Sequence, residues 1–206
     1  MKKFSVSIAG LLVVASTLLS GCNHYTPPFG PVAFGPEWVT LIDGEKGLEN
    51  FTRLGNANWL AQYGAIQGDR LNSGTGSAFL VSKNSYTDFE IYAEFWADEG
   101  TNSGIFIRAT NAKEINTKSA YEVNIFDKSP GYGTGAIVNL GKPSPALKAG
   151  GKWNTYLITA RGPRMTLMMN GMDAVDVSDA KFASGPIALQ YNSGLIRFRK
   201  VMIRTL

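Results

Sequence analysis

The chain has 206 residues, of which 44% are hydrophobic and 17% charged, so it can bury a core and is neither disordered nor fibrous. A formal charge of only +4, without a block of Lys and Arg, argues against a nucleic-acid partner, and a single Cys excludes an internal disulfide. The 23 Gly and 9 Pro, together with 11% aromatic residues, are typical of one domain of short strands joined by turns.

The N-terminus has the pattern of an export signal. Two lysines precede an uncharged run over residues 4–19, which is too short to span a membrane but suits the core of a signal peptide. The run ends in Leu-Ser-Gly-Cys at 19–22, which resembles the lipobox of bacterial lipoproteins. This resemblance implies that residues 1–21 are removed and that Cys22 is lipidated. Asn23 after it suits a periplasmic protein anchored to the outer membrane. The alternative is an unmodified thiol beside a chance apolar stretch.

Residues 22–37 are expected to form a tether, because four prolines fix the backbone and remove hydrogen-bond donors there. The only histidine of the chain, His24, lies in this tether. The globular part therefore has neither His nor Cys. This excludes Ser-His-Asp and Cys-His nucleophile systems, and it excludes a zinc site that contains histidine.

From residue 38 to residue 206, hydrophobic residues alternate with a period of two. One face of the segment 89–96 is apolar, and its members are Phe89, Ile91, Ala93 and Phe95. The same alternation predicts strands at 104–109, 121–126, 153–160, 165–170, 187–191 and 196–204, and Asn170-Gly171 predicts a hairpin turn. Only the stretch 111–119 suits a short helical turn. Short strands at near-regular spacing favour a two-sheet sandwich or jelly roll.

Several polar and aromatic side chains fall on the non-core face of these strands. They are Glu90, Glu94, Trp96, Arg108, Glu122, Asn124 and Gln190. If the strands are neighbours, these residues share one surface. Carboxylates, guanidinium groups and amides can bind sugar hydroxyls, and aromatic planes can cover the C–H face of a sugar. The alternative is an ordinary solvated face with cross-strand Glu–Arg pairs.

A series of motifs resembles the 3-keto-disaccharide hydrolase domain, in order and over about residues 38–206. The motifs include Leu41-Ile-Asp-Gly44, Asp88-Phe-Glu-Ile91, Asn102-Ser-Gly-Ile-Phe-Ile-Arg108, Tyr121-Glu-Val-Asn-Ile125, Trp153-Asn-Thr-Tyr156 and Gly185-Pro-Ile-Ala-Leu-Gln190. The resemblance implies an all-β, concanavalin-like jelly-roll sandwich of two antiparallel sheets. It also implies cleavage of glycosides that are oxidised at C3 of the sugar.

The implied chemistry needs no covalent nucleophile. A ketone at C3 acidifies the C2 proton, so a base can remove it, the enolate can expel the C1 leaving group, and water can add to the enone. The resemblance implies Glu122 as the base or a metal ligand, and Arg108 as the group that binds the ketone oxygen as it becomes negative. Burial would raise the pKa of Glu122 and a nearby Arg108 would lower it, and their separation decides which effect wins.

The other five residues of the polar face are expected to bind substrate, namely Glu90, Glu94, Trp96, Asn124 and Gln190. No cofactor is assigned with certainty, and a divalent cation is left open. The expected partners are an oxidised glycoside and, through the lipid anchor, a membrane.

One departure from the family pattern keeps other functions open. Members of the family often carry His after Leu-Gln of the Gly-Pro-Ile segment, whereas Gln190 is followed here by Tyr191-Asn192-Ser193. A non-catalytic carbohydrate-binding lipoprotein is therefore the first alternative, and a structural envelope protein is the second.

Overall fold

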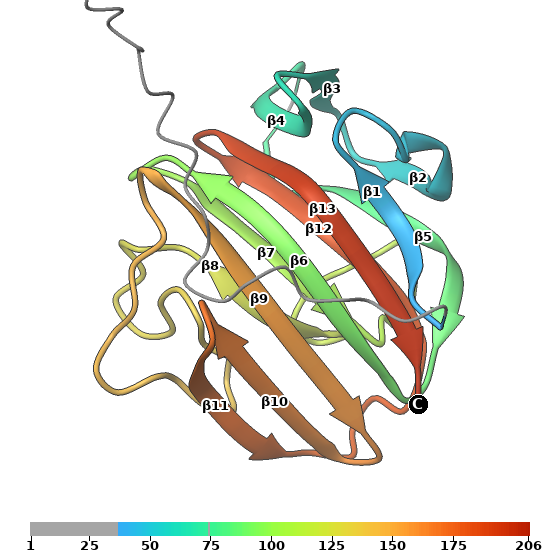
Figure 1. Ribbon diagram of the computed structural model, residues 1–206, viewed down its shortest axis with the longest axis vertical. Helices are drawn as coiled ribbons and strands as arrows, with labels where there is room; N and C mark the ends of the chain where they lie inside the picture. Colours follow the sequence, from blue (N-terminus) through green and yellow to red (C-terminus); the bar gives the residue numbers. More distant parts are fainter. Residues whose placement is uncertain (1–36, 74) are drawn as a thin grey trace, which may run out of the picture.

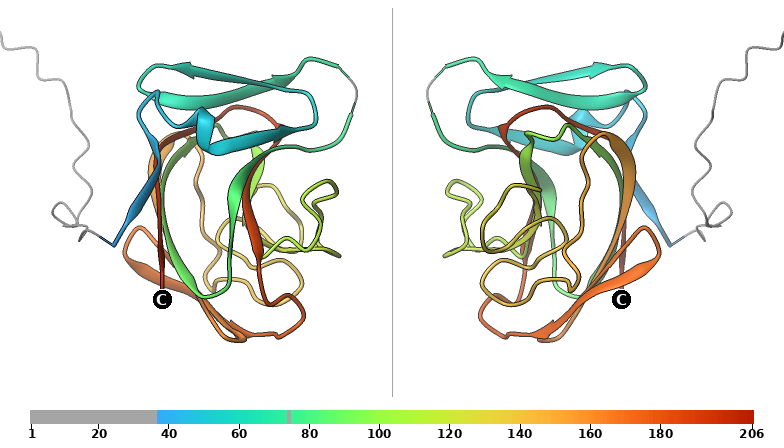
Figure 2. Two further views of the ribbon diagram at one scale, coloured as in Figure 1. Left: turned by 90° about the vertical axis from the view of Figure 1, so that its right-hand side faces the viewer. Right: turned by 90° about the vertical axis from the view of Figure 1, so that its left-hand side faces the viewer.

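A computed structural model describes residues 37–73 and 75–206. The expectations for the signal peptide, for lipidation of Cys22 and for most of the tether lie outside the described residues. Two antiparallel sheets face each other across one core (Figures 1 and 2). The expected all-β sandwich is thus confirmed. No helix in the described part of the chain is long and apolar enough to cross a membrane.

The larger sheet, sheet A, has eight strands, and seven of them follow the order β11-β10-β9-β6-β13-β4-β3 while β1 pairs with β13. Its strands are β1 (Val39–Asp43), β3 (Ala57–Gln62), β4 (Ala65–Leu71), β6 (Phe89–Ala97), β9 (Lys152–Arg161), β10 (Arg164–Met169), β11 (Met172–Ser178) and β13 (Ile196–Thr205). The smaller sheet, sheet B, has the order β2-β5-β12-β7-β8. Its strands are β2 (Phe51–Leu54), β5 (Ala78–Tyr86), β7 (Asn102–Ile107), β8 (Tyr121–Ile125) and β12 (Gly185–Ser193).

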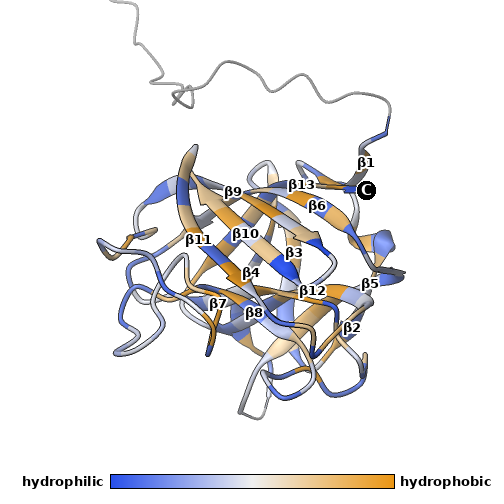
Figure 3. Cartoon of the chain, turned by 90° about the horizontal axis from the view of Figure 1, so that it is seen from below, coloured by the Kyte–Doolittle hydropathy of each residue, from blue (hydrophilic) through white to orange (hydrophobic). Residues whose placement is uncertain are grey.

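The core lies between the sheets and uses the faces that alternation predicts. Phe89, Ile91, Ala93 and Phe95 of β6 are completely buried. On β8, Val123 faces the same core, while its neighbours Glu122 and Asn124 point to the opposite side of sheet B. Apolar stretches accordingly concentrate in the strands, and hydrophilic residues in the connecting loops (Figure 3).

The stretch 111–119, where a short helical turn was expected, contains one such turn but no helix: the N–H groups of Ser119 and Ala120 both donate to the carbonyl of Asn116 at 3.0 Å. This segment forms turns, and the helical element found in the described chain is the short 3-10 helix η1 (Leu48–Asn50). Asn111 and Asn116 accept hydrogen bonds from the backbone N–H groups two residues ahead, at 3.0 and 2.8 Å. Such local bonds compete with helix formation. The segment instead covers part of the outer face of sheet B, where Ile115 packs in a second apolar cluster that includes Phe106.

Candidate active site on the outer face of sheet B

The polar residues expected on one surface are divided between the two sheets. Glu90, Glu94 and Trp96 lie on β6 in sheet A, whereas Glu122, Asn124 and Gln190 lie on β8 and β12 in sheet B. The expectation of one shared surface is therefore wrong. Alternation along a strand is a local property, whereas the sheet to which a strand belongs depends on pairing between distant segments.

On sheet A, the polar outer face is satisfied by its own residues. Arg204 binds Glu90 through Nε at 2.7 Å, and Arg199 binds Glu94 through Nε at 2.5 Å. The guanidinium of Arg197 lies 5.3 Å from the ring centroid of Trp96. These contacts are the cross-strand Glu–Arg pairs of the alternative interpretation. They occupy the groups that had been expected to bind a sugar.

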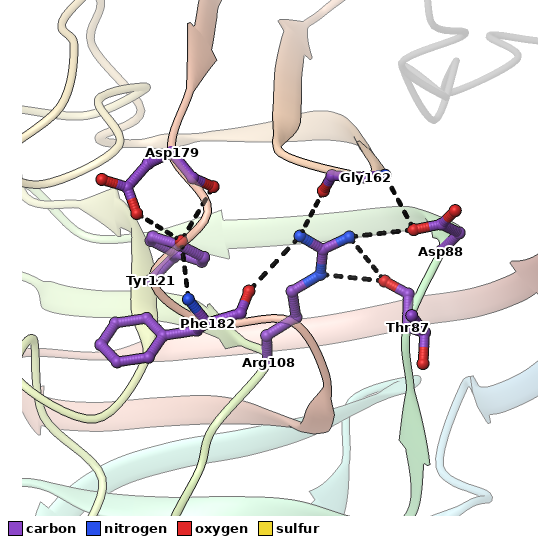
Figure 4. Close-up of polar contacts among 7 residues, drawn as sticks. All are labelled: Thr87, Asp88, Arg108, Tyr121, Gly162, Asp179 and Phe182. Atoms are coloured by element: carbon purple, nitrogen blue, oxygen red, sulfur yellow. Dashed lines mark hydrogen bonds and ion pairs between the residues drawn. The ribbon is translucent and has the colours of Figure 1, made fainter.

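Arg108 does not reach the face that carries Glu122. Its side chain is 1% exposed, and its guanidinium is surrounded by protein acceptors (Figure 4). Nε donates to the carbonyl of Thr87 at 2.9 Å, and Nη2 donates to the same oxygen at 2.6 Å and to Asp88 at 3.1 Å. Nη1 donates to the carbonyl oxygens of Gly162 at 2.7 Å and Phe182 at 3.5 Å. A guanidinium has five N–H donors, and all five are used.

The backbone explains why Arg108 departs from the strand pattern. Strict alternation after β7 would place it beside Phe106, on the outer face. Arg108 instead has a φ of 54°, in the left-handed region that residues other than glycine rarely adopt. Its guanidinium lies 6.0 Å from the ring centroid of Phe89, which belongs to the core. The expected role of Arg108 as the ligand of the ketone oxygen is therefore wrong.

Glu122 lines a cavity of about 370 Å³ on the outer side of sheet B. The other lining residues are Asn102, Asn124, Phe126, Ser129, Gly131, Tyr132 and Val138. Asn102 is part of a motif noted in the sequence. Ser129 and Tyr132 belong to a segment that the sequence shows only as a loop, and only its position directly after the strand at 121–126 points to the site.

The wall of the cavity is formed by the segment 126–138, which folds back along the free edge of β8. The N–H of Asn124 donates to the carbonyl of Ala136 at 2.9 Å, and the N–H of Val138 donates to the carbonyl of Glu122 at 2.9 Å. The amide nitrogen of the Asn124 side chain also donates to the carbonyl of Tyr132 at 2.5 Å. Backbone pairing therefore fixes this segment beside Glu122.

Tyr156 of β9 holds this arrangement from the other side of the core. Its side chain is completely buried, and its hydroxyl accepts a hydrogen bond from the N–H of Gly135 at 2.9 Å and donates one to the carbonyl of Asn124 at 2.8 Å. Burial raises the pKa of Tyr156, so the hydroxyl keeps the proton that it donates. Sheet A thereby positions a strand of sheet B and the cavity wall together.

Asp127 fastens the start of the wall. Its carboxylate accepts hydrogen bonds from the Thr134 hydroxyl at 2.6 Å and from the backbone N–H groups of Ala149 and Gly150, both at 2.9 Å. Because these donors occupy the carboxylate, Asp127 acts as an anchor for two loops.

Burial raises the pKa of Glu122 to about 7. Within the described chain, no hydrogen bond or ion pair of its carboxyl group is found, so the loss of hydration is not offset. The carboxyl lies over Gly104 of the neighbouring strand, and a Cβ atom at that glycine would be 3.4 Å from Glu122 Oε1. A carboxyl group whose pKa lies near neutral pH suits proton transfer.

On β12, the residues after Gln190 do not supply a replacement for the histidine of the family. Tyr191 points into the core, and its hydroxyl donates to the carbonyl of Gly194 at 3.1 Å. The side chain of Asn192 donates to the hydroxyl of Ser77 at 3.0 Å, as the side chain of Gln190 also does. Of the five expected substrate-binding residues, Asn124 and Gln190 share the sheet of Glu122, and their role in binding stays a prediction.

The donor set around Glu122 fits a divalent cation poorly. In the ranges 37–73 and 75–206, no group of three or more His, Cys, Asp and Glu side chains is placed to hold a metal ion. The other side-chain oxygens lining the cavity belong to neutral amides and hydroxyls. A site with a single carboxylate provides little charge for a hard cation. No chemical step is therefore assigned to a metal.

Comparisons with solved structures agree with the fold. A candidate glycosyl hydrolase from Parabacteroides distasonis ATCC 8503 is similar with a TM-score of 0.65 and 25% identity, over 82% of this chain and 99% of that one. The carbohydrate-binding module CBM66 from Bacillus subtilis has a TM-score of 0.58 and 17% identity, over 82% and 96% of the two chains. A Bacillus subtilis protein of unknown function with a galectin-like fold has a TM-score of 0.64 and 8% identity, over 80% and 93%. The last two likenesses concern the fold alone.

No curated protein has a matching sequence. Residues 37–204, which include both sheets except for the last residue of β13, match the model of a domain family. The residues of β7 and β8 that line the cavity, and the segment 126–138 that forms its wall, all lie within this range. The chain belongs to the family of the 3-keto-alpha-glucoside-1,2-lyase-like domain.

Proposed function

We propose that the protein cleaves glycosides that carry a ketone at C3, and that Glu122 is the base that removes the C2 proton. The observation that carries the proposal is the Glu122 carboxyl group, which lines a cavity and whose pKa is raised to about 7 by burial. A base with a pKa near the working pH is both ionised in a large fraction of molecules and strong enough to accept a proton. Membership of the lyase-like family supports the substrate class.

The reaction is balanced as an elimination followed by a hydration. Glu122 takes the proton from C2, and the electron pair of that bond forms the C2=C3 enolate, with the negative charge on the C3 oxygen. The ketone then re-forms, the C1=C2 double bond appears and the C1–O bond breaks. The leaving oxygen gains a proton, which the carboxyl group can return. Addition of water across C1=C2 gives the free 3-keto sugar.

Neutral donors of the cavity are proposed to bind the enolate oxygen. Because every N–H group of Arg108 is already used, the available donors are the side chains of Asn102, Ser129 and Tyr132, which all line the cavity. None of these three side chains makes a hydrogen bond within the described residues. Fixed donors that are aimed at developing negative charge can lower a barrier without a formal positive charge.

The assay uses 3-keto-trehalose and 3-keto-sucrose and measures the release of 3-keto-glucose. We expect turnover by the wild-type protein and a fall of about 100-fold or more for Glu122→Gln, which keeps the shape of the side chain but cannot take a proton. Glu99→Gln is the matched control, because Glu99 is exposed and lies outside the cavity lining. In heavy water, deuterium should enter C2 through the base. Equal turnover by Glu122→Gln and wild type would refute the role of Glu122.

A carbohydrate-binding protein without catalysis is the second candidate. It is favoured by one observation, which is that β12 supplies no histidine: Tyr191 is in the core and Asn192 is engaged with Ser77. Calorimetry with intact and oxidised disaccharides separates the two functions. Binding without product over the whole panel supports this candidate and rules out the enzyme, whereas turnover rules out the candidate.

A further inference from the structure

Two buried amide groups near Glu122 have an oxygen without a hydrogen-bond donor. Asn124 and Gln190 are 5% and 6% exposed, and neither Asn124 Oδ1 nor Gln190 Oε1 has a partner in the described part of the chain. The nitrogen of each amide is already engaged, with the Tyr132 carbonyl and the Ser77 hydroxyl respectively. An acceptor that is buried without a donor costs roughly 1–3 kcal/mol, so two on one sheet face need an explanation.

Both amides flank the glycine over which Glu122 lies. Gly104 pairs with Gln190 on one side and with Asn124 on the other. A Cβ atom at Gly104 would be 3.4 Å from both Cγ and Oε1 of Glu122. Adjacent strands are about 4.8 Å apart and residues two apart on one strand about 7 Å, so these side chains can meet above the glycine.

The protonation state of Glu122 decides whether this group of oxygens is satisfied. An ionised carboxyl can only accept hydrogen bonds, so it would add two more acceptors beside the two amide oxygens. A protonated carboxyl has one O–H, which can be donated to either amide oxygen. Solvent does not reach the two amide oxygens, so bulk water does not supply the missing donor.

We propose that, in the ligand-free protein, the Glu122 carboxyl donates its proton to Asn124 Oδ1 or Gln190 Oε1, and that these two amides are positioning residues that set the pH at which Glu122 can act as a base. Any role of this proton in catalysis rests on the proposed function. Whether Glu122 is protonated in the free protein is a separate property that can be measured without substrate. A hydrogen bond from the neutral acid favours the protonated form and therefore raises the pKa of Glu122, as burial also does.

Other titratable groups around the carboxyl do not oppose this arrangement. The outward-facing residues of β7 and β12 beside Glu122 are neutral, namely Asn102, Gly104, Phe106, Ala188 and Gln190. The wall segment contributes Tyr132 to the cavity, and the Asp127 carboxylate is held by Ala149 and Gly150. In the 108–120 connection, Lys113, Glu114 and Lys118 are exposed, and Arg108 is turned into its own network.

The test is a pH titration of Glu122 in the free protein. The readout is the carbon NMR signal of its carboxyl group in protein that contains isotope-labelled glutamate. The assignment comes from the signal that is lost in Glu122→Gln. Gln190→Met and Asn124→Leu each remove one amide oxygen at similar side-chain volume. In these variants we expect the titration midpoint of Glu122 to fall by about 0.5–1 pH unit, which is a three- to tenfold rise in the ionised-to-protonated ratio at acidic pH. Asn192→Leu is the matched control on β12, because it removes a bond to Ser77 but no unpartnered oxygen.

Each outcome decides the proposal. A wild-type midpoint near 4.3, or variant midpoints within about 0.2 unit of the wild type, overturns it. A saturable fall of the midpoint on addition of Ca²⁺ or Mg²⁺ also overturns it, because the oxygens would then hold a cation. Should Asn124→Leu fail to fold, as shown by urea unfolding, Asn124→Ala takes its place, and the proposal is overturned when neither the Asn124 variant nor Gln190→Met shifts the midpoint. No substrate is used in this test. It can therefore fail while the enzyme assay succeeds, and the enzyme assay can fail while this test succeeds.

Discussion

Replacing Arg108 by Met should destabilise the fold rather than act only on the chemistry of the site. The substitution removes a buried cation and leaves three carbonyl oxygens, of Thr87, Gly162 and Phe182, without their donor. It also removes the 3.1 Å ion pair with Asp88, whose side chain is 35% exposed and can be hydrated in part. A buried network that loses its charged partner typically costs about 3–5 kcal/mol, and each unpaired buried acceptor about 1–3 kcal/mol. We therefore expect a loss of about 3–5 kcal/mol in the free energy of unfolding.

Urea unfolding and thermal unfolding measure this loss. For a domain of this size, about 3–5 kcal/mol corresponds to a fall in Tm of roughly 6–20 °C. Arg70→Met is the control, because the Arg70 side chain is 67% exposed and its contact with Asp69 is 3.8 Å long, so we expect less than about 0.5 kcal/mol. A variant Arg108→Met that keeps its unfolding free energy within about 1 kcal/mol while losing ligand binding or turnover would refute the structural role.

Three further predictions concern the surroundings of Glu122 and the corner near Arg108. Tyr156→Phe should lower the unfolding free energy by about 1–3 kcal/mol, measured in urea, because the N–H of Gly135 and the carbonyl of Asn124 lose a buried partner. The hydrogen bond from the Tyr121 hydroxyl, 2.6 Å from Asp179 Oδ1, lowers the pKa of that carboxyl. Its stabilisation is therefore present above the unfolded pKa and disappears as pH falls through the folded pKa, so Tyr121→Phe should cost less stability in acid than at pH 7. Gly104→Ala would place a Cβ atom 3.1 Å from the Val123 carbonyl and 3.4 Å from Glu122 Oε1, so turnover should fall by up to about 100-fold. In Gly133→Ala, the nearest atom would be an ordinary 3.6 Å away, and turnover should stay unchanged.

Local pattern was sufficient to predict which side of each strand is buried. Phe95 of β6, Ile105 of β7 and Val123 of β8 all face the core as alternation requires. This works because the side-chain period of a strand is a property of the strand itself. Ordered motifs along the chain were sufficient to place Glu122 in the candidate site, and Asn124 beside it.

Long-range pairing was not available from the sequence. The acidic and aromatic face of β6 and the face of β8 look equivalent as patterns, yet β6 pairs with β9 and β13 while β8 pairs with β7. The choice of partner depends on contacts between segments that are far apart in the chain. The sequence pattern therefore does not show that Glu90 and Trp96 lie on a different sheet from Glu122.

A single backbone conformation accounts for the error at Arg108. Its φ of 54° breaks the alternation one residue after β7 ends, and an arginine gives no signal for the left-handed region as glycine or asparagine would. The side chain then enters a ring of carbonyl oxygens that come from three separate loops. Nothing in the local sequence indicates that these loops meet.

The position of Arg108 also settles the competition between the two effects on Glu122. A guanidinium beside the carboxyl would favour its ionised form and lower its pKa, whereas burial favours the neutral form. Because the guanidinium is bound to Thr87 and Asp88, burial acts without opposition and raises the pKa of Glu122 to about 7. The cation that would have bound the enolate would thus have weakened the base. A cavity whose other polar groups are neutral does not lower the pKa of Glu122, and in the proposed reaction it would leave the enolate to hydroxyl and amide donors such as Tyr132.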